Sequence, residues 1–397
     1  MKLARRLEAI KPSPTLALNA KAKALAAQGI DVVGFAAGEP DFDTPQFIKD
    51  GAVEAINAGF TKYTATAGIP ELRAAICDKL KKDNGLEFKP EQVLVSTGAK
   101  HSLYNLFQAL LSEGDEVIIF SPYWVSYPDM VLLAGGKPVI VETREEDGFV
   151  PDPAKLKAAL TPRTRAIILN SPSNPSGVVL SLDALANIAS AIRDHDCLVV
   201  TDDIYEKLLY TPQPFVNLAN AAPDLFPRTV VINGASKAFS MTGWRMGYAA
   251  GPQKLIAAMT MIQDQSTSNC SSITQKAALA ALRGPPDALD AMVKEYVARR
   301  ELFVDGLNAI PGIRCRRPDG AFYVFPNIQG LIGKSFQGKR IDSSVQLSEI
   351  LLDEFRVAAV PGAPFGADAN IRMSFVTSRE NIQKGLGRIR DLVAALA

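Results

Sequence analysis

Five short runs of β-branched and apolar residues recur in the first 240 residues, and longer segments separate most of them. The runs cover 92–95, 116–120, 165–169, 197–201 and 229–232. Apolar residues at helical spacing mark other segments, namely 70–83, 100–111, 182–195, 254–265 and 273–282. Because strands that alternate with helices pair mainly in parallel, this pattern predicts an α/β fold with a mostly parallel sheet sandwiched by helices.

The pattern changes in the last third of the chain. An amphipathic helix is expected over 288–309 and is followed by shorter elements. We expect strands at 312–316 and 321–326, a surface loop over 327–342, and helices at 344–355 and from 379 onward. A chain of 397 residues usually forms more than one domain. We predict a large domain over 45–285, a smaller α+β domain with its connecting helix over 286–397, and an N-terminal arm over 1–44 that joins the small domain.

Charge and composition exclude several classes of protein. Lysine and arginine total 43 and acids total 42, so no net basic field exists to attract nucleic acid or anionic lipid. No apolar run is long enough to span a bilayer, and the first residues lack the apolar core of a signal peptide. The four cysteines and two histidines lack metal-ligand spacing. We therefore expect a cytoplasmic protein with no metal site and no nucleic-acid or membrane partner.

Lys237 lies in a small-residue turn directly after the apolar run 229–232. A lysine among small and apolar groups loses hydration, so its pKa falls and its neutral amine can act as a nucleophile or base. Arg245 follows eight residues later and is suited to bind phosphate. The pair is what pyridoxal phosphate requires, namely a Schiff-base lysine beside a phosphate anchor. The alternative is a surface lysine on a strand-to-helix loop, which the spacing alone favours.

Polar residues follow two of the predicted strands at the edge where open α/β sheets bind ligands. Asn174 lies in a proline-rich turn after the strand 165–169, and its amide could donate to a phenolate oxygen. Asp202 follows the next strand, where a carboxylate can keep a pyridine nitrogen protonated, and Tyr205 lies one turn later. We expect Asp203 to be a solvated neighbour. A turn asparagine and an N-cap aspartate are the competing interpretations.

Small residues also join the strand 92–95 to the helix after it. The backbone N–H groups of Gly98 and Ala99 could bind an anion at this helix N-terminus. Lys100 opposes the helix dipole there, so helix stability does not explain it. Its functional interpretation is a substrate carboxylate ligand, and its alternative is a solvated lysine.

Two further large side chains are candidates. Trp124 follows the strand 116–120 and could stack on a planar heterocycle, although aromatics at strand ends are more often part of the core. Arg372 alternates with apolar neighbours as an inward-facing strand residue would. A buried guanidinium needs a carboxylate partner, which a substrate or a structural acid could provide.

Taken in order, these motifs resemble the class I aminotransferases of fold type I pyridoxal-phosphate enzymes, specifically the aspartate aminotransferase group. The resemblance covers essentially the whole chain. It rests on A-G-E-P-D-F at 37–42, K-Y at 62–63, G-I-P-E-L-R at 68–73, S-P-S-N-P-S-G at 171–177, D-D-I-Y at 202–205, S-K-A-F-S-M-T-G-W-R at 236–245 and R-M-S at 372–374.

The resemblance implies a role for each cofactor contact. Lys237 would hold the cofactor and later move the substrate proton, and Asp202 would pair with the ring nitrogen. Tyr205 and Asn174 would bind the ring 3′ oxygen, with Trp124 stacked on the ring. The phosphate ligands would be Arg245, the amides of Gly98 and Ala99, and Tyr63 from the second subunit of a homodimer.

The resemblance also implies the substrate contacts. Arg372 would bind the α-carboxylate close to the Gly38 backbone, while Trp124 and Asn174 would also contact the substrate. Lys100, with Thr15 and Ser13, matches a bacterial subgroup that uses lysine for the distal carboxylate; some members accept prephenate. The expected activity is amino-group exchange between aspartate or glutamate and 2-oxoglutarate or oxaloacetate, with prephenate as an additional acceptor.

One departure and three alternatives remain. Many relatives carry a phosphate-binding serine three residues before the lysine, where this chain has Gly234, and Ser236 stands next to Lys237 instead. We assign neither residue a phosphate role. The same fold also serves aminotransferases for aromatic and other amino acids, C–S lyases, and effector-binding modules fused to DNA-binding helices. The balanced charge of the chain argues against the last of these.

Overall fold

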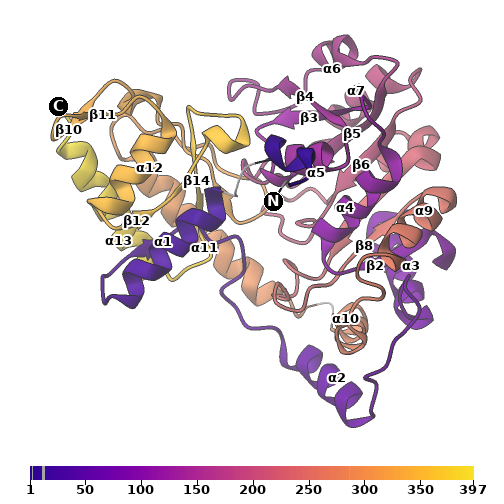
Figure 1. Cartoon of the computed structure of the whole chain (residues 1–397). Coiled ribbons are helices and arrows are strands. Elements are labelled where there is room, and N and C mark those ends of the chain that lie inside the picture. Colours follow the sequence, from indigo (N-terminus) through magenta and orange to yellow (C-terminus); the bar gives the residue numbers. More distant parts are fainter. Residues whose placement is uncertain (2, 11–13, 286) are drawn as a thin grey trace.

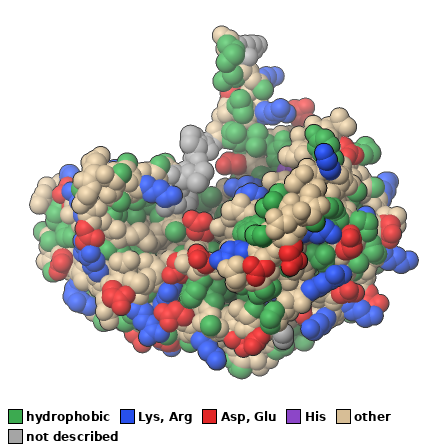
Figure 2. Space-filling model, turned by 90° about the horizontal axis from the view of Figure 1, so that it is seen from below, with side chains coloured by type: hydrophobic (Ala, Val, Ile, Leu, Met, Phe, Trp, Pro, Cys, Tyr) green, Lys and Arg blue, Asp and Glu red, His purple; other side chains and the backbone are tan. Residues whose placement is uncertain are grey.

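The computed structural model describes residues 1, 3–10, 14–285 and 287–397. Figure 1 shows a large α/β body on one side and a smaller body that contains the C-terminus on the other, with α11 (Asp290–Asn308) between them. Helix α11 was predicted over 288–309. Charged side chains of both signs are interspersed on the face seen in Figure 2, as the balanced composition predicts.

A seven-stranded sheet forms the centre of the large body. Its strand order is β2-β8-β7-β6-β5-β3-β4. The strands are β2 (Val93–Ser96), β3 (Glu116–Ser121), β4 (Lys137–Glu142), β5 (Thr164–Asn170), β6 (Leu198–Asp202), β7 (Thr229–Gly234) and β8 (Gly247–Ala250). Only β8 runs against its neighbours, so the predicted mostly parallel sheet is confirmed.

Helices cover both faces of this sheet because its strands are apolar on both sides. In β7, Val230 and Ile232 pack with the helices on one face, and Val231 packs with those on the other. The first face carries α4 (Ala99–Leu110), α5 (Ser126–Leu133) and α9 (Gln253–Asp264). The other carries α3 (Pro70–Asn84), α6 (Pro153–Ala159), α7 (Leu182–Ile192), α8 (Leu218–Ala221) and α10 (Ser272–Arg283). Helix α2 (Gln46–Asn57) packs on α10.

The five predicted helices of this body are all present, and their ends differ from the prediction by three residues at most. The sequence pattern missed α2, α5, α6, α8, β4 and β8. Strand β8 reads Gly-Tyr-Ala-Ala and lacks β-branched residues. It still occupies a central position, because Gly247 lets its backbone pass directly beside the α4 N-terminus; a Cβ there would overlap the Ala99 nitrogen.

The smaller body is built from short strands and two helices. They are β9 (Tyr323–Val324), β10 (Ser335–Phe336), β11 (Lys339–Arg340), α12 (Ser344–Asp353), β12 (Val357–Ala358), β13 (Val360–Pro361), β14 (Ile371–Ser374) and α13 (Arg379–Ala394). Strand β14 pairs with β13 and β9 in a three-stranded sheet. The predicted helices at 344–355 and from 379 correspond to α12 and α13.

Two sequence predictions for this body were wrong, and a third was right only in part. The expected strand at 312–316 is a single bridge between Arg314 and Asn327, and the one at 321–326 reduces to β9. The expected loop at 327–342 contains the hairpin of β10 and β11. Gln337 and Gly338 connect its strands with positive φ angles of 47° and 78°, as a two-residue hairpin turn requires. Only the glycine of this turn is visible as a signal in sequence.

The N-terminal elements contact both bodies: η1 (Arg5–Ala9) lies against α5 of the large body, whereas the two elements after it pack against the smaller body. Strand β1 (Val33–Gly34) pairs in parallel with β12, and α1 (Pro14–Ala27) packs on β12 and β13. The assignment of 1–44 to an arm that joins the small domain, and the boundaries at 44 and 285, stay predictions. Short 3-10 helices complete the fold: η1 (Arg5–Ala9), η2 (Pro90–Gln92), η3 (Pro223–Arg228), η4 (Gln329–Leu331) and η5 (Ala363–Phe365).

The described residues lack two features. None of the helices they form has both the length and the apolar character needed to cross a membrane. Within the same residues, histidine, cysteine and acidic side chains nowhere gather in a group of three that could hold a metal ion.

Candidate active site

A cavity of about 400 Å³ lies at the carboxyl ends of β5, β6 and β7, where the smaller body meets the sheet. The sheet side contributes the strand ends and the first turn of α4, and the smaller body contributes Tyr323 and Arg372. The predicted site residues that line it are Gly38, Ala99, Lys100, Trp124, Asn174, Asp202, Tyr205, Lys237, Arg245 and Arg372. Residues far apart in sequence thus meet at one place.

Lys237 follows β7 and points into this cavity. Its Nζ donates a hydrogen bond of 2.6 Å to the Gly38 carbonyl oxygen. Burial lowers the pKa of Lys237 to about 8; Arg245 and Arg372 also lower it, whereas Glu39 and Asp202 oppose the shift. A solvated surface lysine, the alternative in sequence, does not fit these contacts. The side chain has the environment of a nucleophilic amine.

Asp202 is the last residue of β6, and its side chain is only 4% exposed. The Tyr127 hydroxyl donates to its Oδ2 at 2.6 Å, and the Ile204 N–H donates to its Oδ1 at 3.4 Å. Burial raises the pKa of Asp202 to about 6, and the hydrogen bond from Tyr127 works against that rise. No helix follows Asp202, so the N-cap interpretation is wrong.

Asp203 corrects another expectation from sequence. It is buried, not solvated, and its Oδ2 accepts hydrogen bonds from the Asn217 side chain at 2.7 Å and from the Thr201 hydroxyl at 3.3 Å. Asp203 is not among the residues that line the cavity, whereas Asp202 is.

Arg372 is 3% exposed, and its guanidinium lies 4.5 Å from the centre of the Tyr323 ring. It donates to the Asn174 side-chain oxygen at 3.0 Å and to the Ala36 carbonyl oxygen at 3.1 Å, while its Nε has no partner. Within the described part of the chain, no carboxylate forms an ion pair with it. The structural acid that sequence left open is therefore absent there, and a buried positive charge faces the cavity.

Asn174 is held by contacts on two sides. Its backbone N–H donates to the Asn170 side-chain oxygen at 2.8 Å, and its own side-chain oxygen accepts from Arg372. The side chain therefore does not satisfy its own backbone, as the turn interpretation requires, and its amide nitrogen remains as a donor.

The Tyr205 hydroxyl lies 2.9 Å from the Tyr323 hydroxyl. Gly38 lies beside this pair, since a Cβ at position 38 would come within 3.2 Å of the Tyr323 oxygen. A side chain at position 38 would press on this oxygen, so glycine allows the backbone to approach the two tyrosines.

Arg245 and the first turn of α4 form one end of the cavity. Gly98 adopts a φ of 91°, and a Cβ there would lie 2.5 Å from an Arg245 terminal nitrogen. One expected contact needs correction, because the Gly98 N–H already donates to the Ser96 carbonyl oxygen at 2.8 Å. The lack of a side chain, not the amide, is what Gly98 contributes. Ala99 begins α4, and N–H groups of a first helical turn have no intrahelical partner.

The departure at Gly234 also has a steric reason. A Cβ at position 234 would lie 2.8 Å from the Met246 carbonyl oxygen, so the packing of β7 on β8 leaves no room for serine. Ser236 is buried and lines the cavity, whereas Gly234 does not.

Lys100 and Trp124 also line the cavity. The Lys100 Nζ lies 4.7 Å from the centre of the Trp124 ring. Burial lowers the pKa of Lys100, and the charge of Arg245 adds to the effect. Trp124 is half-buried and contacts the edge of Tyr127 at 5.3 Å between ring centres. Its ring is therefore part of the cavity wall rather than of a closed core.

Tyr63 and Thr15 are not among the residues that line the cavity. Tyr63 is 91% exposed. Thr15 is the second residue of α1, but its side chain lies outside what the structure describes, as does the whole of Ser13. Their roles stay predictions.

Tyr127 and Tyr323 are the site residues that sequence reasoning missed. Tyr127 lies one helical turn after Trp124, so the spacing from a suspected site residue was an available signal. Tyr323 lies in an apolar stretch and carries no local signal of its contacts with Tyr205 and Arg372.

Comparisons with known proteins agree with this geometry. The family model for class I and II aminotransferases matches residues 30–389. The chain belongs to this aminotransferase family. It is 49% identical to the aspartate/prephenate aminotransferase of Nitrosomonas europaea, over 99% of this chain and 100% of that one. It is also 49% identical to the aspartate aminotransferase of Bacillus subtilis, over 99% of each chain.

Solved structures of other aminotransferases share the whole fold. The aspartate aminotransferase of Rhizobium meliloti superimposes with a TM-score of 0.97 at 44% identity, and the match covers 100% of both chains. That of Thermus thermophilus with maleate gives 0.92 at 46% identity, over 99% of this aminotransferase and 100% of that chain. The expected fold type I architecture is thereby confirmed.

Proposed function

We propose that this aminotransferase uses pyridoxal 5′-phosphate to exchange the amino group of aspartate or glutamate with 2-oxoglutarate or oxaloacetate, and that prephenate is an additional acceptor. The observation that carries the proposal is Arg372, a buried guanidinium without an acid partner among the described residues, in the same cavity as the low-pKa amine of Lys237. The names of relatives, including an aspartate/prephenate aminotransferase, support the choice of substrates.

The residues present fit the cofactor. A Cβ at Gly98 would fill a space beside Arg245 and the N-terminus of α4, which we call the phosphate cradle. This space suits a phosphate. The buried Asp202 carboxylate suits a ring nitrogen, the Tyr205 hydroxyl and the Asn174 amide suit the ring 3′ oxygen, and Trp124 offers its ring for stacking. When bound, the cofactor supplies an electron sink for the bond that breaks at the substrate Cα.

The protein's own groups then have defined tasks. Arg372 would bind the α-carboxylate and so direct the Cα–H bond toward Lys237. The neutral Lys237 amine would attach the cofactor, and once substrate frees it, Nζ would take the proton from the substrate Cα and deliver it to the cofactor's C4′ carbon. A pKa near 8 leaves a useful fraction of this amine neutral close to physiological pH.

Lys100, together with Thr15, is our candidate ligand for the second carboxylate of dicarboxylic substrates. Lys100→Ala is expected to lower kcat/KM for aspartate and prephenate by about 10- to 100-fold, the worth of one hydrogen bond to a charged group. Aromatic substrates lack that carboxylate and are expected to change little. Steady-state kinetics of Lys100→Ala and of the control Lys339→Ala, which replaces an exposed lysine in β11, would measure this.

Two outcomes of this series would contradict the proposal. An unchanged preference for dicarboxylates in Lys100→Ala would remove Lys100 from specificity. Release of ammonia and pyruvate without any keto acid acceptor would indicate a lyase in place of an aminotransferase.

We further propose that the active unit is a homodimer in which Tyr63 of a second copy completes the phosphate site. Exposed apolar side chains support this. Val53 and Ile56 on α2 are each 51% exposed, Met261 on α9 is 66% exposed, and Tyr63 follows α2 in the chain. Apolar surface of this kind is typical of a protein contact.

Gly98→Ala tests the phosphate cradle. Its Cβ would meet the Arg245 guanidinium, so we expect the affinity of the apo-protein for pyridoxal phosphate to fall about 10-fold or more, equivalent to ~1.4 kcal/mol. Gly59→Ala is the matched control, because Gly59 also has a positive φ, 70°, but has open space around it. Both variants are expected to lose about 1 kcal/mol of unfolding free energy from backbone strain. Equal cofactor affinity in the two would contradict the cradle.

A further inference from the structure

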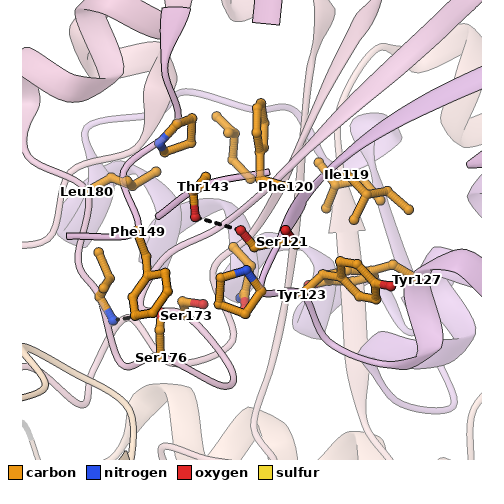
Figure 3. Close-up of a pocket in the computed structure, with 16 residues that line it drawn as sticks. Ile119, Phe120, Ser121, Tyr123, Tyr127, Thr143, Phe149, Ser173, Ser176 and Leu180 are labelled. Atoms are coloured by element: carbon orange, nitrogen blue, oxygen red, sulfur yellow. Dashed lines mark hydrogen bonds between the residues drawn. The ribbon is translucent and has the colours of Figure 1, made fainter. Parts of the chain in front are cut away.

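Tyr127 is a buried tyrosine in the first turn of α5 that contacts the acid at the end of β6. Its hydroxyl donates to Asp202 Oδ2 at 2.6 Å, across 75 residues of sequence. Its ring packs edge-on against Trp124, with an interplanar angle of 84°. Figure 3 shows Tyr127 at the edge of a second, small cavity, and the same residue also lines the active-site cavity. The hydroxyl has one strong partner, and that partner is the site carboxylate.

The Tyr127 hydroxyl can act only as a donor in this pair. Burial raises the pKa of Tyr127 well above its ordinary value, and the neighbouring Asp202 adds to the rise. A neutral phenol that donates to Oδ2 stabilises the ionised carboxylate and leaves Oδ1 directed elsewhere. In the described structure, the other donor to the Asp202 carboxylate is the Ile204 N–H on Oδ1, at 3.4 Å. Tyr127 is thus the strongest contact that sets this carboxylate's charge and orientation.

The charged and titratable groups around Asp202 do not replace this contact. Lys237, after β7, favours the ionised carboxylate through its charge but makes no hydrogen bond to it. Tyr205, on the same segment as Asp202, is directed to Tyr323. The Asp203 carboxylate accepts a hydrogen bond from Asn217, and its negative charge and that of Asp202 repel each other.

We propose that Tyr127 is a positioning residue that holds Asp202 ionised and oriented, so that the proton shared with the cofactor's ring nitrogen stays on the nitrogen. This inference rests on the proposed function, in which Asp202 pairs with that nitrogen. Without the hydroxyl, the buried carboxylate gains stability by taking the proton itself. The ring nitrogen is then neutral and withdraws electrons from the reacting bond less strongly.

Tyr127→Phe is the test, because it removes the hydroxyl and keeps the ring that packs on Trp124. We expect kcat to fall about 10-fold or more while KM for aspartate changes little, since Arg372 and Lys100 are untouched. The acid limb of the kcat profile is expected to move up by about 1 pH unit, because loss of a hydrogen bond to the ionised form raises the pKa of Asp202. Tyr210→Phe is the matched control; its hydroxyl donates to the Ala321 carbonyl oxygen, away from Asp202.

A binding measurement gives a readout that does not depend on turnover. The apo-protein is titrated with pyridoxal phosphate and with the analogue in which C–H replaces the ring nitrogen. Wild type and Tyr210→Phe are expected to prefer the true cofactor. This preference is expected to shrink about 10-fold in Tyr127→Phe, because a neutral carboxyl group gains less from a protonated nitrogen. Thermal melts of both variants check that the fold survives.

Asp202→Asn separates failure of this inference from failure of the proposed function. If Asp202→Asn keeps the wild-type preference for the true cofactor, Asp202 does not pair with the ring nitrogen and both statements fall. If Asp202→Asn loses the preference while Tyr127→Phe keeps it and keeps the wild-type acid limb, the role of Tyr127 alone is overturned.

Discussion

Replacing Lys237 with alanine is expected to lower kcat by about 10⁴-fold or more, because one substitution removes both the amine that attaches the cofactor and the base that moves the substrate proton. The visible absorption band of the lysine-bound cofactor is expected to disappear with it. Absorbance spectra and steady-state rates of the purified variant measure both effects. Turnover within 100-fold of wild type would remove Lys237 from the reaction.

Lys237→Arg is the control that distinguishes the effect of the positive charge at position 237 from that of a reactive amine. A guanidinium keeps the positive charge that Glu39 and Asp202 face, but it stays protonated at every accessible pH. It is therefore expected to be as inactive as the alanine variant. Activity in the arginine variant would show that position 237 acts through charge alone.

The pH dependence of cofactor capture tests the same residue in the apo-protein. Burial lowers the pKa of Lys237 to about 8, so the neutral amine gains population as pH rises and is the main form above pH 8. The rate of reaction with pyridoxal phosphate is expected to rise about 10-fold per pH unit below this value and then to level off. A rate that still rises toward the pKa of an ordinary lysine would contradict the buried environment.

Arg372→Leu is expected to lower kcat/KM for aspartate by about 10³-fold, or ~4 kcal/mol, because the α-carboxylate would lose its buried charged partner. Arg372→Lys is expected to lose less, since it keeps the charge, but still to fall well below wild type because a lysine cannot form the paired hydrogen bonds of a guanidinium. Kinetics with aspartate and with glutamate measure the series.

The free energy of unfolding distinguishes a substrate-binding role of Arg372 from a structural role. The guanidinium contacts neutral oxygens of Asn174 and Ala36, so its removal leaves no buried carboxylate unpaired in the described structure. We expect the free energy of unfolding of Arg372→Leu to stay within about 1 kcal/mol of wild type. A loss of ~3–5 kcal/mol, as when a buried ion pair is broken, would indicate a structural partner instead.

Most of the large body was predictable because its signals are local. Each parallel strand of the core carries a run of apolar residues, and each helix carries its own periodicity. The prediction failed for strands that are very short or that form only because neighbouring strands pair with them. Strand β8 has small residues and exists because it fits between β2 and β7, and the two-residue strands of the smaller body are too short for any period to appear.

Three residues of the candidate site were predictable for the same reason. Asn174, Asp202 and Lys237 each follow an apolar run, and parallel strands bring their carboxyl ends to one edge of a sheet. The alternative interpretations of these residues were a surface lysine, a turn asparagine and an N-cap aspartate. The neighbouring sequence alone could not exclude them. They were rejected by contacts, such as the hydrogen bond of Lys237 to Gly38, which lies 199 residues away.

The sequence by itself determined the elements and the chemistry available at their ends, because secondary structure and residue type are local properties. Tertiary structure alone decided which groups meet and in what charge state. Asp202 and Tyr127 are 75 residues apart, and Arg372 and Asn174 are 198 apart. Their contacts, and the burial that shifts the pKa of Asp202 and of Lys237, arise only when the fold closes around one cavity, since desolvation depends on every neighbour at once.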